Sequence, residues 1–182
     1  VFEREAAIRG EVSSFDGYRF SVMLNEPLSD SVATRFALDY QNRDTFINYA
    51  TPGQQLVDGV DRLQSFTGRA SVLWQPVDVP DLSMQFTYSR SETDRPQTEN
   101  VDVPFEELNR TTNPFPPTFP TQSDSVVWET RYDFSDTFGL RNTLTFSSFE
   151  AQHNVAVPDQ GQTSSEGEDF SNELLLDFES AD

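Results

Sequence analysis

The stretch VATRFALDYQNR, from Val32 to Arg43, decides the fold class of this chain. One parity of the stretch holds Val32, Thr34, Phe36, Leu38 and Tyr40, whereas the other is mostly polar or charged. Successive side chains of a β-strand point to opposite faces, so this alternation predicts a strand with one apolar and one polar face. Two environments fit such a strand. Either the apolar face packs on a protein core and the charged face meets water, or the apolar face meets lipid and the charged face lines a lumen.

The composition supports a β-rich chain and excludes several partners. Phe is common, at 16 of 182 residues, and 8 Gly with 11 Pro provide many turns. The formal net charge of −19 argues against nucleic acid, whose phosphates need a basic surface, and against adsorption on anionic lipid. The absence of Cys excludes disulfides, zinc–thiolate sites and cysteine nucleophiles. No run of about 18 apolar residues occurs, so we expect no transmembrane helix.

Hydrophobic alternation predicts an all-β fold, an antiparallel meander of about eight strands forming one domain over residues 1–182. The expected strands are residues 2–13, 18–28, 32–43, 66–76, 82–91, 125–134, 140–150 and 170–179. Three long loops are expected at residues 44–65, 92–124 and 151–169. After the second strand, short turns rich in Pro, Asp, Ser or Gly alternate with these loops.

This alternation of loop lengths carries topological information. In a meander, alternate connections lie at opposite ends of the sheet, so one end is tight and the other bears large loops. Outer-membrane barrels have this asymmetry, with short periplasmic turns and long extracellular loops. A soluble sandwich can also carry long loops at one end, so loop length favours the membrane interpretation without deciding it.

Two passages resemble a known family. NEPLSDSVATRFALDYQNRDTFINYAT, residues 25–51, combines a "PLSD" turn, an alternating strand and an aromatic continuation. FTGRASVLWQPVDVPDLSMQFTYSRSETD, residues 66–94, combines a "GRA" strand, a "W-x-P" turn and an aromatic strand. In this order and spacing, the passages resemble the early barrel of TonB-dependent outer-membrane receptors. The resemblance is specific over the first half of the chain, and the second half matches only as generic hairpins.

The resemblance implies a location in the bacterial cell outer membrane and a role in importing a scarce nutrient, such as a ferric siderophore, cobalamin or an oligosaccharide. Family members have a plug domain followed by a barrel of about 22 strands. The chain is then expected to be a fragment of a large transmembrane β-barrel that lacks the plug, and alone it would form an open or self-associated sheet. The implied partners are the plug, the remaining barrel strands, outer-membrane lipid, the small nutrient ligand and, through missing regions, a TonB-type energy transducer. The alternative is a soluble, secreted all-β binding or adhesion module.

Two groups of residues are candidates for function. The Pro-rich loop offers ligand contacts through Phe105, Arg110, Phe115 and Phe119. The charged strand faces offer lumen-facing Arg35, Asp39, Arg69, Glu129 and Arg131, for which ordinary cross-strand ion pairing is the simpler interpretation.

Catalysis and metal binding have weaker support in the sequence. The lone His153 lacks a nucleophile motif and is expected to be a surface residue, so we expect no enzyme activity and no cofactor. Two segments that contain several acidic residues, 56–62 and 159–170, could offer oxygen ligands to calcium. Neither segment has the residue spacing of a calcium-binding loop, so no metal site is predicted.

One observation separates the two main interpretations. In a membrane barrel the side chains of Phe36, Leu38, Val72, Phe86 and Trp128 should lie on the convex outer surface. In a soluble module the same side chains should be mutually buried.

Overall fold

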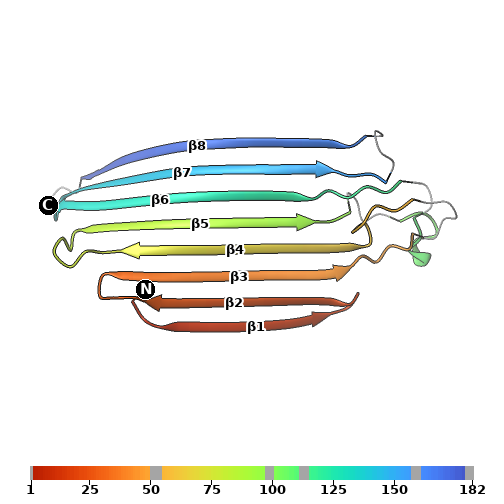
Figure 1. The fold of residues 1–182 in the computed structure, drawn as a ribbon, viewed down its shortest axis with the longest axis horizontal. Coiled ribbons are helices and arrows are strands. Elements are labelled where there is room, and N and C mark those ends of the chain that lie inside the picture. Colours follow the sequence, from red (N-terminus) through yellow and green to blue (C-terminus); the bar gives the residue numbers. More distant parts are fainter. Residues whose placement is uncertain (1, 50–54, 97–100, 111–114, 157–160, 179–182) are drawn as a thin grey trace.

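The computed structural model describes residues 2–49, 55–96, 101–110, 115–156 and 161–178, and it contains one antiparallel sheet. The strands are β1 (Glu5–Ser13), β2 (Gly17–Pro27), β3 (Val32–Asp44), β4 (Arg62–Trp74), β5 (Leu82–Asp94), β6 (Thr121–Ser135), β7 (Phe138–His153) and β8 (Thr163–Phe178). They lie side by side in chain order (Figure 1), which confirms the predicted meander. A short 3-10 helix, η1 (Phe105–Glu107), lies in the connection between β5 and β6. Among the described residues, no helix is long and apolar enough to cross a membrane.

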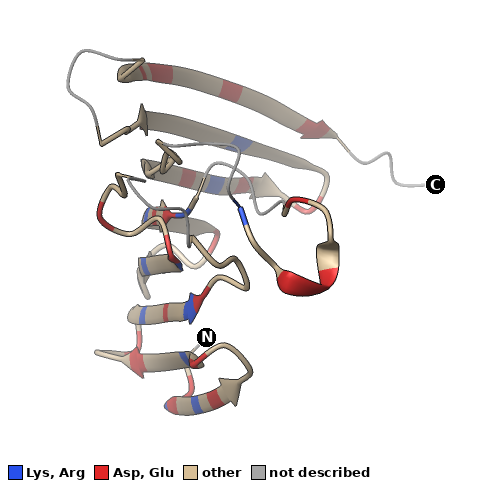
Figure 2. Ribbon diagram, turned by 90° about the vertical axis from the view of Figure 1, so that its right-hand side faces the viewer, with Lys and Arg blue, Asp and Glu red and all other residues tan. Residues whose placement is uncertain are grey.

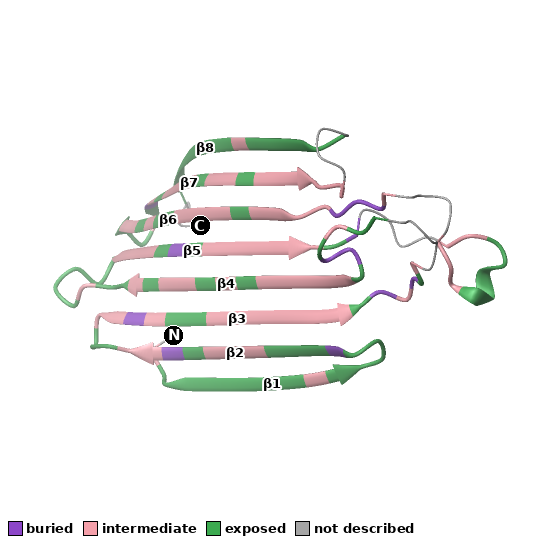
Figure 3. Cartoon of the chain, turned by 45° about the vertical axis from the view of Figure 1, so that its right-hand side comes forward, coloured by how far each residue is buried: buried purple, intermediate pink, exposed green. Residues whose placement is uncertain are grey.

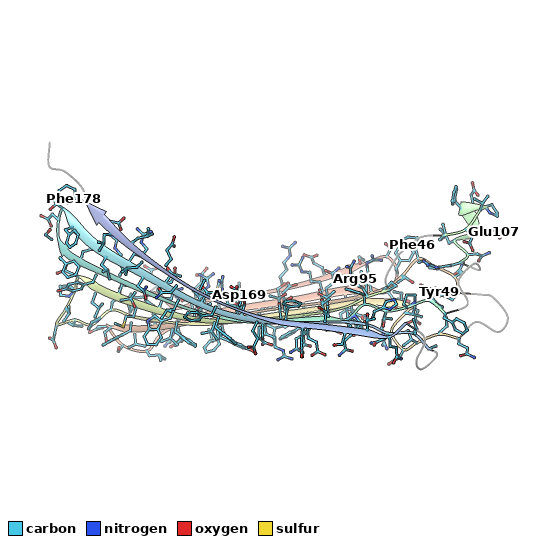
Figure 4. The ribbon with its side chains drawn as sticks, turned by 90° about the horizontal axis from the view of Figure 1, so that it is seen from above. Phe46, Tyr49, Arg95, Glu107, Asp169 and Phe178 are labelled. Carbon is cyan, nitrogen blue, oxygen red and sulfur yellow. The ribbon has the colours of Figure 1, made fainter. Side chains whose placement is uncertain are left out.

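The sheet is open and bowed. Within the described part of the chain, β1 pairs only with β2 and β8 pairs only with β7, so each leaves one edge without a partner strand. Figure 4 shows the sheet bowed along its strands, with Phe46 and Glu107 on the side toward which it curves. An open edge presents unpaired N–H and C=O groups, which a further strand would satisfy.

Several strands extend beyond their predicted bounds. β8 begins at Thr163 rather than at residue 170, β6 begins at Thr121 rather than at 125, and β4 begins at Arg62 rather than at 66. The added segments hold mainly polar residues such as Ser, Glu, Asp and Gln, and of these the acidic residues are depleted in strands by local propensity. Neighbouring strands of matching length supply ladder hydrogen bonds, and these override that propensity; His153 of β7 pairs with Thr163, for example. The first strand is shorter than predicted, because it begins at Glu5.

The connections follow the predicted asymmetry but are shorter than expected. Long connections join β3 to β4, β5 to β6 and β7 to β8 at the right-hand end in Figure 1, where the short β1–β2 turn also lies, and the short turns after β2, β4 and β6 lie at the other end. The predicted loops 44–65, 92–124 and 151–169 reduce to 45–61, 95–120 and 154–162. Residues 50–54, 97–100, 111–114 and 157–160 of these loops, and residue 179 of the last predicted strand, lie outside the described residues.

Buried side chains gather in the loops rather than over the sheet. Ile47, Val60, Pro116 and Thr118 are buried among the long connections, and Figure 3 shows this purple cluster at the long-loop end. The sheet itself has no second layer of described residues over either face. The loop cluster is therefore the part of the molecule that most resembles a packed core.

Candidate functional site

The register of the sheet defines two faces, which we call the apolar face and the polar face. One continuous row of the apolar face crosses all eight strands through Ala6, Leu24, Phe36, Ala70, Tyr88, Val126, Phe146 and Phe170. The adjacent row belongs to the polar face and holds Glu5, Asn25, Arg35, Ser71, Thr87, Val127, Thr145 and Ser171. The alternation seen in Val32–Arg43 therefore extends across the whole sheet.

The apolar side chains form a band that runs obliquely across the apolar face. On β2 the band extends from Tyr18 to Leu24, and Glu26 follows it. On β8 it extends from Phe170 to Phe178, with Glu166 and Glu168 on the long-loop side. Leu24 and Phe170 occupy the same row of the sheet, so the last apolar row of β2 is the first of β8.

The slope of this apolar band can be estimated from sheet geometry. Between β2 and β8 its upper limit moves from the level of Asn42 to the level of Phe36, an average of about one residue for each strand crossed, and the whole change falls between β2 and β5. One residue rises about 3.4 Å and neighbouring strands lie about 4.8 Å apart, so the band makes an angle of about 35° with the line perpendicular to the strands. Strands in closed barrels tilt by about 35–45° from the barrel axis. A horizontal apolar belt around such a barrel would cross its strands with this slope.

The side chains that separate the two interpretations are not mutually buried. Phe36 is 50% exposed, Val72 41%, Phe86 43% and Trp128 47%, and Leu38 is half-buried. Trp74, the second tryptophan of the chain, lies on the same face and is 43% exposed. By contrast, the buried strand residues in the described ranges all lie on the polar face, namely Gly17, Asn25, Ala33, Thr87 and Gly139. Side chains crowd together on the inner side of a curved sheet and spread apart on its outer side, and this distribution matches that pattern.

The polar face carries all five predicted lumen-facing residues, and their environments differ. Asp39 accepts hydrogen bonds from Arg19 Nε, at 2.9 and 3.1 Å to its two oxygens, and from Ser21 Oγ at 2.6 Å. This is the cross-strand ion pairing that we expected for the charged faces. Arg131 instead pairs with Asp133 on its own strand, at 3.1 Å.

The other three residues of this group are different. Arg35, Arg69 and Glu129 have no ion pair or side-chain hydrogen bond with any described residue. Cross-strand pairing therefore does not account for Arg35 and Arg69, which are both exposed.

The three long connections are joined by backbone hydrogen bonds into one loop cluster. The Asn48 N–H donates to Leu108 O at 2.8 Å, and the Arg110 N–H donates to Asn48 O at 3.1 Å. Thr118 and Asn154 exchange two hydrogen bonds of 3.0 Å. These bonds join the β5–β6 connection to the β3–β4 and β7–β8 connections. The backbone at this end of the sheet is therefore held in place by hydrogen bonds between the three connections.

The predicted ligand-contact residues occupy different parts of this loop cluster. Phe105 is exposed on η1, whereas Arg110, Phe115 and Phe119 are half-buried. The Phe119 ring lies 6.4 Å from the His153 ring, and His153 Nδ1 is 2.7 Å from Gly161 O. His153 is therefore half-buried at the end of β7, with its ring held between Phe119 and the Gly161 carbonyl. Phe105 is the one member of the group that presents a large exposed apolar side chain.

A hollow of about 250 Å³ lies where the loop cluster meets the apolar face. Tyr40, Phe66, Glu92, Asp94 and Glu150 line it. Burial raises the pKa of the Asp94 carboxyl, which lies beyond the apolar band at the end of β5. The nearby Arg62 guanidinium opposes this rise in the pKa of Asp94 without cancelling it.

The acidic segments considered for calcium are dispersed by the fold. Residues 163–170 belong to β8, so their side chains alternate between the two faces, and residue 159 lies outside the described residues. Asp58 lies in the turn before β4 and pairs with Arg62 at 2.9 Å. In the described ranges, no group of three or more His, Asp or Glu side chains is placed to hold a metal ion.

No protein-family model matches the sequence, and no solved structure matches the chain. The geometry described above is therefore the basis for any statement about function.

Sequence reasoning missed the arginines of the first two strands. Arg9 and Arg19 lie on the polar face beside Asp39, and Arg9 pairs with Glu11 at 2.5 Å. Their shared parity with polar neighbours was visible in the sequence, but the register that brings Arg19 next to Asp39 was not.

Proposed function

We propose that this chain forms part of the wall of an outer-membrane β-barrel of the TonB-dependent receptor class, whose activity is import of a scarce nutrient. In this proposal the apolar face meets lipid, the polar face lines the lumen and the loop cluster lies outside the cell. The nutrient would be a ferric siderophore, cobalamin or an oligosaccharide, as the resemblance of residues 25–51 and 66–94 to the family implies.

The observation that carries the proposal is the oblique apolar band. A soluble protein needs a second layer over an apolar sheet face, and the described residues supply none. A lipid belt instead needs exposed apolar side chains at one height around a barrel of tilted strands. The shift of about one residue for each strand follows from that requirement, and nothing in a flat sheet-on-sheet contact demands it.

Two further features agree with a wall segment. From β2 onward, long connections gather at one end and short turns at the other, as in outer-membrane barrels. Both outer strands have a free edge among the described residues, and further strands of a larger barrel would pair with these edges.

The two tryptophans give a direct test of the lipid-facing surface. The full chain is folded into phosphatidylcholine vesicles whose acyl chains carry bromine, which quenches tryptophan fluorescence on contact. Trp74 and Trp128 both lie on the apolar face, so we expect strong quenching by the brominated lipid and little quenching by acrylamide in the water. The matched control replaces both tryptophans with Phe and carries Thr67→Trp on the polar face. This variant should show little quenching by the lipid. Equal quenching of the two proteins, or a wild-type chain quenched only from the water, would contradict the proposal.

Import is tested in the cell that makes the protein. A strain lacking the gene should grow normally in rich medium and fail to grow when one nutrient of these classes is supplied at limiting concentration. A plasmid copy should restore growth, and uptake should stop when the proton-motive force is collapsed. Unchanged uptake of all three nutrient classes would contradict the receptor assignment while leaving the membrane test intact.

A further inference from the structure

A second hollow, of about 510 Å³, lies against the sheet over β1 to β4. The small side chains of Ala7 and Ala37, with Met23 between them, form its floor, because these three residues share one row of the polar face. Charged side chains line it, namely Arg9, Arg35, Asp39 and Arg69. The hollow therefore combines an apolar floor with guanidinium groups.

Arg35 and Arg69 flank the same floor residue. Arg69 is directly opposite Ala37 on the neighbouring strand, and Arg35 lies two positions earlier on the strand of Ala37. Diagonal neighbours of this kind lie about 7–8 Å apart, and their Cβ atoms lie somewhat closer. Two long arginine side chains at that spacing can reach one anionic group from two sides.

The charges around the hollow are neutralised except at these two residues. Arg19 and Ser21 hold the Asp39 carboxylate by hydrogen bonds of 2.6–3.1 Å, and Arg9 pairs with Glu11. Arg35 and Arg69 have no such partner among the described residues. The chain contains 31 acidic residues against 12 basic ones, so carboxylates are not scarce. Two unpaired guanidinium groups beside one hollow thus leave a local positive charge in a strongly acidic protein.

We propose that this hollow binds a small organic carboxylate with an apolar body, held at its carboxylate by Arg35 and Arg69. The planar guanidinium forms paired hydrogen bonds with a carboxylate, and the floor of Ala7, Met23 and Ala37 accepts an aromatic or aliphatic group. The volume is in the range of small-molecule sites, which is about 300–1,000 Å³. This inference goes beyond the proposed function and depends on the hollow alone. The result of the lipid-quenching test therefore does not decide whether the hollow binds a carboxylate.

The experiment titrates the full chain, folded in detergent micelles, with 4-fluorobenzoate and follows the fluorine resonance by NMR. We expect a saturable shift for 4-fluorobenzoate and none for the neutral 4-fluorobenzamide. Arg35→Gln and Arg69→Gln should each weaken binding about tenfold or more, because each removes a charge-assisted hydrogen bond. Arg141→Gln is the matched control, since Arg141 lies on the same face but pairs with Asp177 on β8. It should leave binding unchanged.

Ala37→Leu separates this site from simple charge attraction. The added atoms fill the floor while both arginines remain, so binding of 4-fluorobenzoate should be lost. Far-UV circular dichroism checks that each variant keeps its sheet, and Arg35→Lys provides a milder change that keeps the charge but loses the paired geometry.

Four results would overturn the proposal. Binding of the amide as strongly as the acid would indicate adsorption to apolar surface. The arginine variants could bind normally, or Arg141→Gln could lose as much affinity as they do. Inorganic phosphate could displace the probe at equal concentration, which would show that the hollow recognises charge without an apolar body.

Discussion

Replacing Val60 by Ala tests whether the loop cluster is a cooperative packed unit. Val60 is 1% exposed in the turn before β4, and the substitution removes two methyl groups from that buried position. Each buried methyl group contributes about 0.8 kcal/mol, and the cavity left behind adds to the loss, so we expect the loop cluster to lose about 2 kcal/mol of stability. At 1.4 kcal/mol for each factor of ten, local opening becomes about 30-fold more frequent.

Hydrogen–deuterium exchange measures this opening at named amides. The Thr45 N–H donates to Asp61 O at 2.8 Å, directly beside Val60, and should exchange about 30-fold faster in Val60→Ala. Amides in the ladder between β1 and β2 should be unaffected, because that part of the sheet lies away from the loop cluster. Leu56→Ala is the control, since Leu56 lies in the same connection but is 47% exposed, and it should change exchange very little. If Val60→Ala and Leu56→Ala gave the same small effect, or if exchange rose uniformly along the chain, the loop cluster would not be a packed unit.

Three other substitutions test separate features. Burial raises the pKa of Asp94 in the folded protein, so the folded state binds the proton more tightly and the free energy of unfolding falls as pH rises through that pKa. Asp94→Asn should therefore raise the urea midpoint at pH 7 and have no effect below about pH 3; a lower midpoint at pH 7 would mean that attraction to Arg62 dominates. Gly59 has φ +82°, and a Cβ there would lie 3.1 Å from Asp94 Oδ2, whereas Gly161 has φ +79° with nothing within 4 Å. Both changes to Ala should cost about 1–2 kcal/mol for the left-handed backbone, and Gly59→Ala should cost more by the contact; equal urea midpoints would show that the contact relaxes freely. Finally, Thr87 is buried on the polar face and its Oγ1 lies 3.1 Å from Ser71 Oγ. Thr87→Val should cost about 1 kcal/mol in urea unfolding, and adding Ser71→Ala should recover part of it; strict additivity of the two would argue against the hydrogen bond.

The eight strands could be predicted because their alternation is a local property. Val32, Phe36 and Leu38 share a face in any strand, whatever lies beside it. The long-loop end could be predicted too, since the order of short and long connections in a meander fixes it. The extension of β8 to Thr163 could not, because its Ser- and Glu-rich start is held by pairing with β7 rather than by its own preference.

Register marks the limit of what the sequence predicts about the candidate site. The pairing of Arg19 with Asp39 depends on which residues face each other across β2 and β3, and a shift of two residues that set Arg43 opposite Arg19 would separate them while keeping the same alternation. The same is true of the floor made by Ala7, Met23 and Ala37. The bridge between Asn48 and Asn109 joins two loops far apart in the chain, and no local signal announces it.

The free edge of β8 affects how copies of the protein associate with one another. This strand carries Glu166, Glu168, Asp169, Glu173 and Asp177 and no basic residue, and Figure 2 shows its acidic bands without a blue one. Two copies that met along this edge would bring rows of like charge together at the spacing of paired strands, so the edge repels its own kind while it remains open to a neutral or basic strand. Dissolved salt screens that repulsion. A preparation that stays dispersed at low ionic strength should therefore form edge-to-edge stacks, and then fibrous aggregates, as the salt concentration rises.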